Sequence, residues 1–86
     1  MMEAKDNEQA IFDRNGMIIE HTENFNPNIA GYLSDIVQKS REILNSKDTL
    51  NSIELFYENQ VIILKDNCST NLHMAMIVEN STKKLI

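Results

Sequence analysis

The stretch AIFDRNGMII, residues 10–19, decides the fold of this chain. Two short apolar runs, 9–13 and 17–21, flank the tripeptide Arg14-Asn15-Gly16. An Asn-Gly pair readily takes the positive φ angles that a tight primed hairpin turn needs, and it is the strongest local signal in the sequence. The stretch therefore predicts a β-hairpin near the start of the chain.

A long amphipathic helix is predicted after this hairpin, over residues 27–46. Asn26 can cap the helix, and Pro27 loses no needed hydrogen bond at the first helical position. The apolar positions fill an arc of about 160° at 100° per residue, which is wider than one sheet contact requires. These positions are Ile29, Ala30, Tyr32, Leu33, Ile36, Val37, Ile43 and Leu44. We expect the margin formed by Tyr32, Ile36 and Ile43 to face a second neighbour, although a broad contact with the chain's own sheet remains an alternative.

Three strands are predicted in the second half of the chain, at 50–57, 60–65 and 71–79, because these segments are rich in β-branched and aromatic residues and are separated by turn formers. The order is then β-β-α-β-β-β. This is an α+β domain with a five-stranded antiparallel sheet and one main helix on one face. Residues 9–79 form the domain, between a frayed leader at 1–8 and a tail at 80–86.

The strands are too apolar for a sheet that one helix covers on one face only. All four residues of 61–64 are apolar, and the last strand carries apolar side chains on both faces. We expect Met74 and Met76 in the core, although Met-rich faces can also serve adaptable binding. The opposite face, with Phe56, Ala75 and Ile77, must then be covered by the N-terminal leader, by the tail or by another chain. Hiding about 400 Å² of such surface contributes on the order of 10 kcal/mol before association costs, so a partner is expected to support folding as well as function.

Composition excludes several classes of partner. The 86 residues carry a net charge of -5 and no cluster of Lys or Arg, so nucleic acid is not expected to bind. A single cysteine, Cys68, excludes an internal disulfide. The chain has no apolar run long enough to span a bilayer and no apolar segment in its first ten residues, which predicts a soluble cytoplasmic protein without membrane insertion.

No set of catalytic, cofactor-binding or metal-ligating residues can be assembled from the sequence. His21 and His73 lie far apart without a second ligand at suitable spacing, and Asp66 near Cys68 disfavours a thiolate. The isolated glycines Gly16 and Gly31 form no phosphate loop. We therefore expect a protein that is not an enzyme.

The hairpin AIFDRNGMII, the helix 27–46 and the strand segments IELFY (53–57), VIIL (61–64) and HMAMIV (73–78) together resemble the roadblock/LC7 superfamily. The resemblance covers roughly residues 9–79. It implies dimerisation with another roadblock chain, identical or not, through the edge strand 51–57 and the helix. The interface residues that it implies are Tyr32, Ile36, Lys39, Ile43, Glu54, Phe56 and Tyr57.

Within the superfamily, the chain is most similar to the short subunits of the Ragulator complex, in which a scaffold subunit wraps the uncovered sheet face. That similarity implies a scaffold that recruits Rag-type small GTPases for TORC1 signalling and lies on the late endosome or lysosome through its partners. The alternative is a homodimer of the dynein light chain or prokaryotic type, the latter regulating a GTPase.

Overall fold

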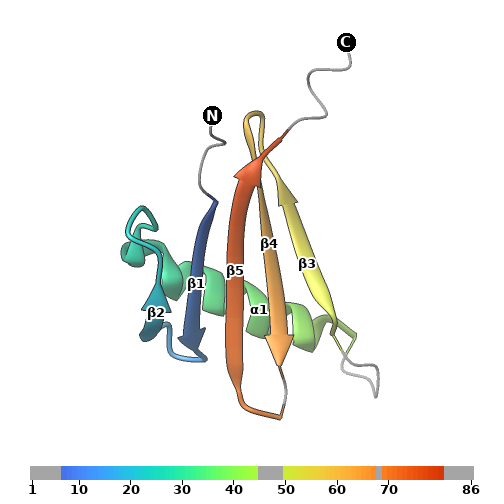
Figure 1. The fold of residues 1–86 in the computed structure, drawn as a ribbon. Helices are drawn as coiled ribbons and strands as arrows, with labels where there is room; N and C mark the ends of the chain where they lie inside the picture. Colours follow the sequence, from blue (N-terminus) through green and yellow to red (C-terminus); the bar gives the residue numbers. More distant parts are fainter. Residues whose placement is uncertain (1–6, 45–49, 68, 81–86) are drawn as a thin grey trace.

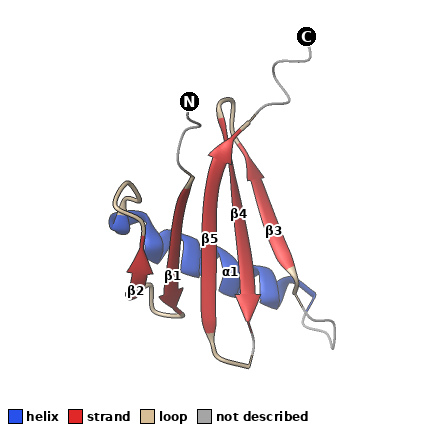
Figure 2. Ribbon diagram, in the orientation of Figure 1, coloured by secondary structure: helices blue, strands red, loops and turns tan. Residues whose placement is uncertain are grey.

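The computed structural model describes residues 7–44, 50–67 and 69–80 (Figure 1). The predicted α+β architecture is confirmed, with five strands and one main helix (Figure 2). The elements are β1 (Glu8–Asp13), β2 (Ile18–His21), a 3-10 turn (Pro27–Ile29), α1 (Ala30–Leu44), β3 (Ser52–Phe56), β4 (Gln60–Asn67) and β5 (Leu72–Glu79). Most of the predicted leader and tail, and the predicted helical positions 45 and 46, lie outside the described residues.

The sheet has the order β2-β1-β5-β4-β3, and every pairing is antiparallel. β3, β4 and β5 form a meander, and β5 then pairs with β1 at the centre of the sheet. Helix α1 runs across one face, behind the strands in Figure 1. The opposite face carries no helix from the described residues, and β2 and β3 are the two edges.

The predicted hairpin forms, but its turn is not the primed type. Gly16 has φ +83°, whereas Asn15 is not among the residues with positive φ. The Asp13 carboxylate explains the difference, because Oδ1 accepts from the backbone N–H of Asn15 and of Met17, each at 2.9 Å. The Asp13 side chain stabilises a turn in which only one residue has a positive φ angle, and glycine, at position 16, adopts that angle without strain.

The turn is also packed against the start of the helix. A Cβ on Gly16 would lie 2.6 Å from the Cα of Gly31. The Arg14 carbonyl accepts a hydrogen bond from Ser34 Oγ at 2.5 Å and another from Gln38 Nε2. The hairpin and the helix are therefore joined by a close backbone approach that only glycine allows at position 16.

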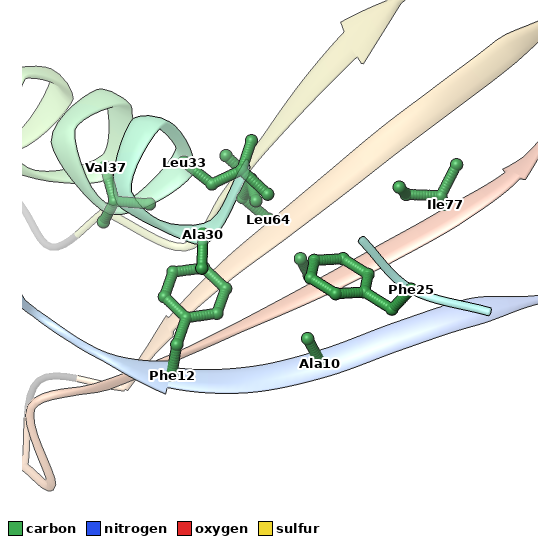
Figure 3. Close-up of a cluster of buried hydrophobic side chains, with 9 residues drawn as sticks. Ala10, Phe12, Phe25, Ala30, Leu33, Val37, Leu64 and Ile77 are labelled. Atoms are coloured by element: carbon green, nitrogen blue, oxygen red, sulfur yellow. The ribbon is translucent and has the colours of Figure 1, made fainter. Parts of the chain in front are cut away.

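Helix α1 begins as the sequence predicts. The Asn26 side chain accepts from the Asn28 N–H at 3.0 Å, and Pro27 opens the 3-10 turn that leads into α1. The buried side of the helix packs on β1, β4 and β5 (Figure 3). The core cluster consists of Ala10, Phe12, Phe25, Ala30, Leu33, Val37, Leu64, Ala75 and Ile77.

Phe25 is a core residue that the sequence places in a polar connection. Its side chain is 2% exposed and points into the cluster between sheet and helix (Figure 3). Polar neighbours on both sides hide this role, because a single aromatic residue in a loop has no periodicity. Phe25 closes the core where the chain passes from β2 to the helix.

Candidate partner-binding surfaces

One side of helix α1 is exposed and carries large apolar side chains. Tyr32 and Ile43 are 75% and 76% exposed. Positions 32, 36, 39 and 43 are spaced by four and three residues, which places them on one side of a helix. Lys39 is exposed there, and its Nζ lies 3.5 Å from Asp35 Oδ1. We call Tyr32, Ile36, Lys39 and Ile43 the helix stripe.

The helix stripe resolves the alternative left open by the sequence. Tyr32 and Ile43 do not spread over the chain's own sheet, because three quarters of each residue is exposed. Ile36 differs from them, since it is half-buried and packs against the core cluster. The stripe is therefore an exposed surface with its inner border on the core, which is typical of a surface that another protein covers.

Strand β3 is a free edge of the sheet with exposed aromatic residues. Phe56 is 64% exposed and Tyr57, just after the strand, is 56% exposed. Glu54 is exposed at the middle of the strand, while Ile53 and Leu55 pack against the core on the helix side. Phe56 therefore lies on the opposite face of the sheet from Ile53 and Leu55.

The helix stripe and β3 both contact the core cluster. Ile36 of the stripe and Leu55 of β3 both pack against the core cluster. All seven residues that the resemblance implies for the dimer interface thus lie on α1, on β3 or next to it. Tyr32, Lys39, Ile43, Glu54, Phe56 and Tyr57 are exposed in the single chain, whereas Ile36 is half-buried.

The prediction for the uncovered sheet face is wrong at Ala75 and Ile77. Both residues face the helix. Ala75 is 0% exposed and lies opposite Ala10 on β1 and Leu64 on β4, and Ile77 is 7% exposed and lies opposite Ile62 on β4. Met74 and Met76, which we expected in the core, are on the other face. A strand that is apolar on both faces gives no alternation from which to tell them apart, and the small Ala75 lets the helix lie close to the sheet.

The face of the sheet opposite the helix is nevertheless apolar, as predicted from the composition of the strands, and within residues 7–44, 50–67 and 69–80 no helix covers it. Met74, on β5, lies opposite Ile11, and Met76 lies opposite Ile63. Val61 lies between Phe56 and Val78. We call this set the open face: Ile11, Phe56, Val61, Ile63, Met74, Met76 and Val78. Phe56 and Met74 are exposed, Val61 is buried, and the others are half-buried. A hollow of ≈ 700 Å³ lies at one end of it, where Lys65 and Leu72 contribute to the lining.

A buried ionic cluster joins the end of α1 to β4 and β5. Arg41 donates to both Asp66 oxygens, from Nε to Oδ2 at 2.7 Å and from Nη2 to Oδ1 at 2.8 Å. His73 Nδ1 lies 3.1 Å from the same Oδ1. The side chains of Asp66 and His73 are 1% and 0% exposed, and that of Arg41 is 26% exposed.

The sequence analysis missed this cluster, although Arg41 gave a signal for it. Arg41 follows Val37 by four residues and so lies on the core side of the helix, where a charged group requires a partner. Burial lowers the pKa of His73, since the nearby Asp66 carboxylate only partly offsets the desolvation of an imidazolium. Among the described residues, His73 Nε2 has no hydrogen-bond partner, and the Phe12 ring lies edge-on to the imidazole with 5.6 Å between the ring centroids.

Within residues 7–44, 50–67 and 69–80, no group of three or more His, Cys, Asp or Glu side chains is placed to hold a metal ion. His21 is exposed, and its Nδ1 lies 2.6 Å from the Thr22 carbonyl oxygen. In the same part of the chain, no helix is long and apolar enough to cross a membrane.

Comparison with solved structures identifies the fold as that of roadblock/LC7 proteins. Myxococcus xanthus MglB superposes with a TM-score of 0.70 at 13% identity, over 85% of this chain and 63% of that chain. An MglB in a tetrameric arrangement gives 0.69 at 10% identity, over 84% and 59%. A roadblock/LC7 domain from Streptomyces avermitilis gives 0.62 at 8% identity, over 84% and 64%. The chain thus spans about three fifths of the length of these proteins. No family model and no curated protein matches the sequence.

Proposed function

We propose that this chain is a non-catalytic interaction module that forms a homodimer through the helix stripe and β3, and that the dimer binds and regulates a small GTPase. Two observations together carry this proposal: the exposed apolar side chains of the helix stripe, and the exposed aromatic residues at the β3 edge of the sheet. The GTPase follows from the resemblance to prokaryotic-type roadblock proteins, and the bacterial proteins with the same fold support that branch of the superfamily.

The two edges of the sheet differ in their suitability for pairing. β2 has four residues, and its register with β1 is interrupted between Ile11 and Phe12, which blunts it as a template. β3 has five residues in unbroken register with β4. Antiparallel pairing of β3 with its symmetry mate would join two sheets into one and bring two copies of Phe56 and Tyr57 under cover.

A two-fold dimer of this kind uses the same patch on both subunits. The opposite charges of Lys39 and Glu54 suit such an interface, because both are exposed, one on the stripe and one on the strand. Aromatic anchors such as Tyr32, Phe56 and Tyr57 are the residues that dominate the energetics of protein interfaces. The absence of catalysis is part of the proposal, and a metabolite screen with activity lost in His73→Ala would contradict it.

Disulfide cross-linking tests the dimer directly. In a Cys68→Ser background, Glu54→Cys places a thiol at the middle of β3, where an antiparallel mate would bring the two Cα atoms to about 4.5 to 5.5 Å. We expect efficient cross-linking under mild oxidation, and none for the control Met17→Cys at the other edge of the sheet. Equal cross-linking of both variants, or cross-linking at position 17 alone, would contradict the proposed interface.

The GTPase is tested after co-purification from the native cell. Any small GTPase recovered with the tagged chain should be purified and titrated, loaded with GTP or GDP, against the wild-type protein. We expect binding that differs between the two nucleotide states and that is lost in Phe56→Asp together with the dimer. Unchanged GTPase binding in Phe56→Asp would contradict the proposal, because it would show that the GTPase does not need the dimer.

The second candidate is a Ragulator-type scaffold subunit paired with a different roadblock chain, acting in Rag GTPase recruitment and TORC1 signalling at the lysosome. The open face favours it, because a wrapping subunit would cover Met74, Met76 and Ile63. Met74→Asp should then abolish recovery of a scaffold subunit while leaving the paired roadblock chain bound. If Met74→Asp recovers the same proteins as wild type, this candidate fails.

A further inference from the structure

The buried Arg41–Asp66–His73 cluster connects the end of α1 to β4 and β5, two strands that are themselves paired at this point. Arg41 lies in the last turn of α1, while Asp66 and His73 are paired neighbours on β4 and β5. Both Asp66 oxygens are engaged by Arg41, and one is shared with His73. The cluster therefore fixes the end of the helix to the sheet.

A second proton on His73 cannot be accommodated in this arrangement. With Nδ1 donating to Asp66, protonation would put an N–H on Nε2, which is buried and has no hydrogen-bond acceptor in the part of the chain that the structure describes. The charge of Asp66 is already balanced by Arg41, and Arg14 adds a further positive charge nearby. Phe12 supplies only an aromatic ring on the β1 side. The proton is thus taken up when the cluster opens to water.

We propose that the Arg41–Asp66–His73 cluster is a proton-sensitive clamp, whose opening on acidification frees the end of α1 and weakens the partner surface formed by the helix stripe and β3. The effect on the partner rests on the proposed function. The link is physical, because Lys39 and Ile43 of the stripe lie two residues before and two residues after Arg41 in the same helix.

The direction of the pH effect follows from the lowered pKa of His73. The clamp is fully stable above the ordinary histidine pKa of 6.5, and its stability falls as the pH drops from there toward the lower pKa of the closed state. In that window, the opening equilibrium rises by up to about tenfold per pH unit. Below the closed-state pKa the dependence levels off.

The test is the dimer dissociation constant at about pH 7.5 and pH 5.5, since only histidine has an unperturbed pKa between them. It is measured by sedimentation for wild type, His73→Phe and the control His21→Gln, which removes the only other imidazole. We expect each of the two clamps of a dimer to contribute up to about tenfold, so that dissociation increases several-fold to about a hundredfold at the lower pH in wild type and in His21→Gln. The change should be much smaller in His73→Phe.

A wild-type response equal to that of His73→Phe would overturn the clamp. If His73→Phe does not fold, His73→Gln replaces it, because its amide can donate to Asp66 without titrating. An NMR titration of the wild type gives an independent result, and a His73 pKa at or above 6.5 in the folded protein would also overturn the proposal. A chain that stays monomeric at both pH values contradicts the proposed function, and urea unfolding of wild type and His73→Phe at the two pH values then decides the clamp alone.

Discussion

Replacing Gly16 by Ala tests the contact on which the hairpin and helix depend. Gly16 has φ +83°, and a Cβ there would lie 2.6 Å from Gly31 Cα and 3.0 Å from Gly31 N, both backbone atoms that cannot turn away. The left-handed backbone costs a non-glycine residue about 1 to 2 kcal/mol, and overpacking adds about 1 to 3 kcal/mol. We therefore expect Gly16→Ala to lower the free energy of unfolding by about 2 to 5 kcal/mol.

Gly31→Ala is the matched control, because it adds the same methyl group on the other side of the same contact. A Cβ on Gly31 meets nothing within 4 Å, and the position is exposed inside helix α1. Alanine there should raise the free energy of unfolding by about 0.5 to 1 kcal/mol through helix propensity.

Urea unfolding followed by circular dichroism measures both changes. The midpoints should move in opposite directions with unchanged slopes, since neither change alters the surface exposed on unfolding. A Gly16→Ala midpoint within error of wild type, or a drop for Gly31→Ala as large as for Gly16→Ala, would refute the close approach between turn and helix.

Three further predictions concern the core, the cluster and the surface. Phe25→Ala should lower the free energy of unfolding by about 3 to 5 kcal/mol in urea unfolding, because the ring is buried. A loss below about 1 kcal/mol would show that the Phe25 ring is not part of the core. Asp66→Asn should lower the free energy of unfolding by about 2 to 3 kcal/mol, which is less than the loss for a fully buried ion pair because Arg41 can still reach water. The same variant should show a smaller pH dependence of unfolding between neutral and mildly acidic conditions. Phe56→Asp should convert the dimer to a monomer in sedimentation while leaving the monomer folded, whereas Met17→Asp, at an equally exposed apolar position, should leave the dimer intact; loss of the dimer in both variants would indicate a general effect of added charge.

The elements that the sequence predicts well are those with a strong local cause. The hairpin depends on the glycine of the turn, and the helix start depends on Asn26 and Pro27; both appear where expected. The type of the turn was not predictable from the Asn-Gly pair, because the side chain of Asp13 decides it. Local chemistry thus located these elements and left their finer geometry to neighbouring groups.

The face of a strand was harder to predict than the strand itself. β5 is apolar on both sides, so hydrophobicity did not distinguish Ala75 from Met74 or Met76. The prediction that the sheet face opposite the helix is also apolar is confirmed, although two of its residues were assigned to the wrong side. The total apolar area of the strands is a property of composition, while its division between faces depends on packing.

The candidate partner residues were predictable where they lie on a helix of known phase. Tyr32 and Ile43 follow from their spacing, and Phe56 follows from alternation along an edge strand. The Arg41–Asp66–His73 cluster joins residues that are far apart in sequence, so only Arg41, a charge on the core side of the helix, indicated that a partner was needed.

Sedimentation equilibrium of the purified chain alone tests the central claim most directly. The helix stripe and the β3 edge predict a dimer whose mass follows a reversible monomer–dimer equilibrium and which becomes a monomer in Phe56→Asp. A wild-type chain that remains a monomer at every concentration and still unfolds cooperatively would contradict the account, because it would show that these apolar surfaces need no second copy.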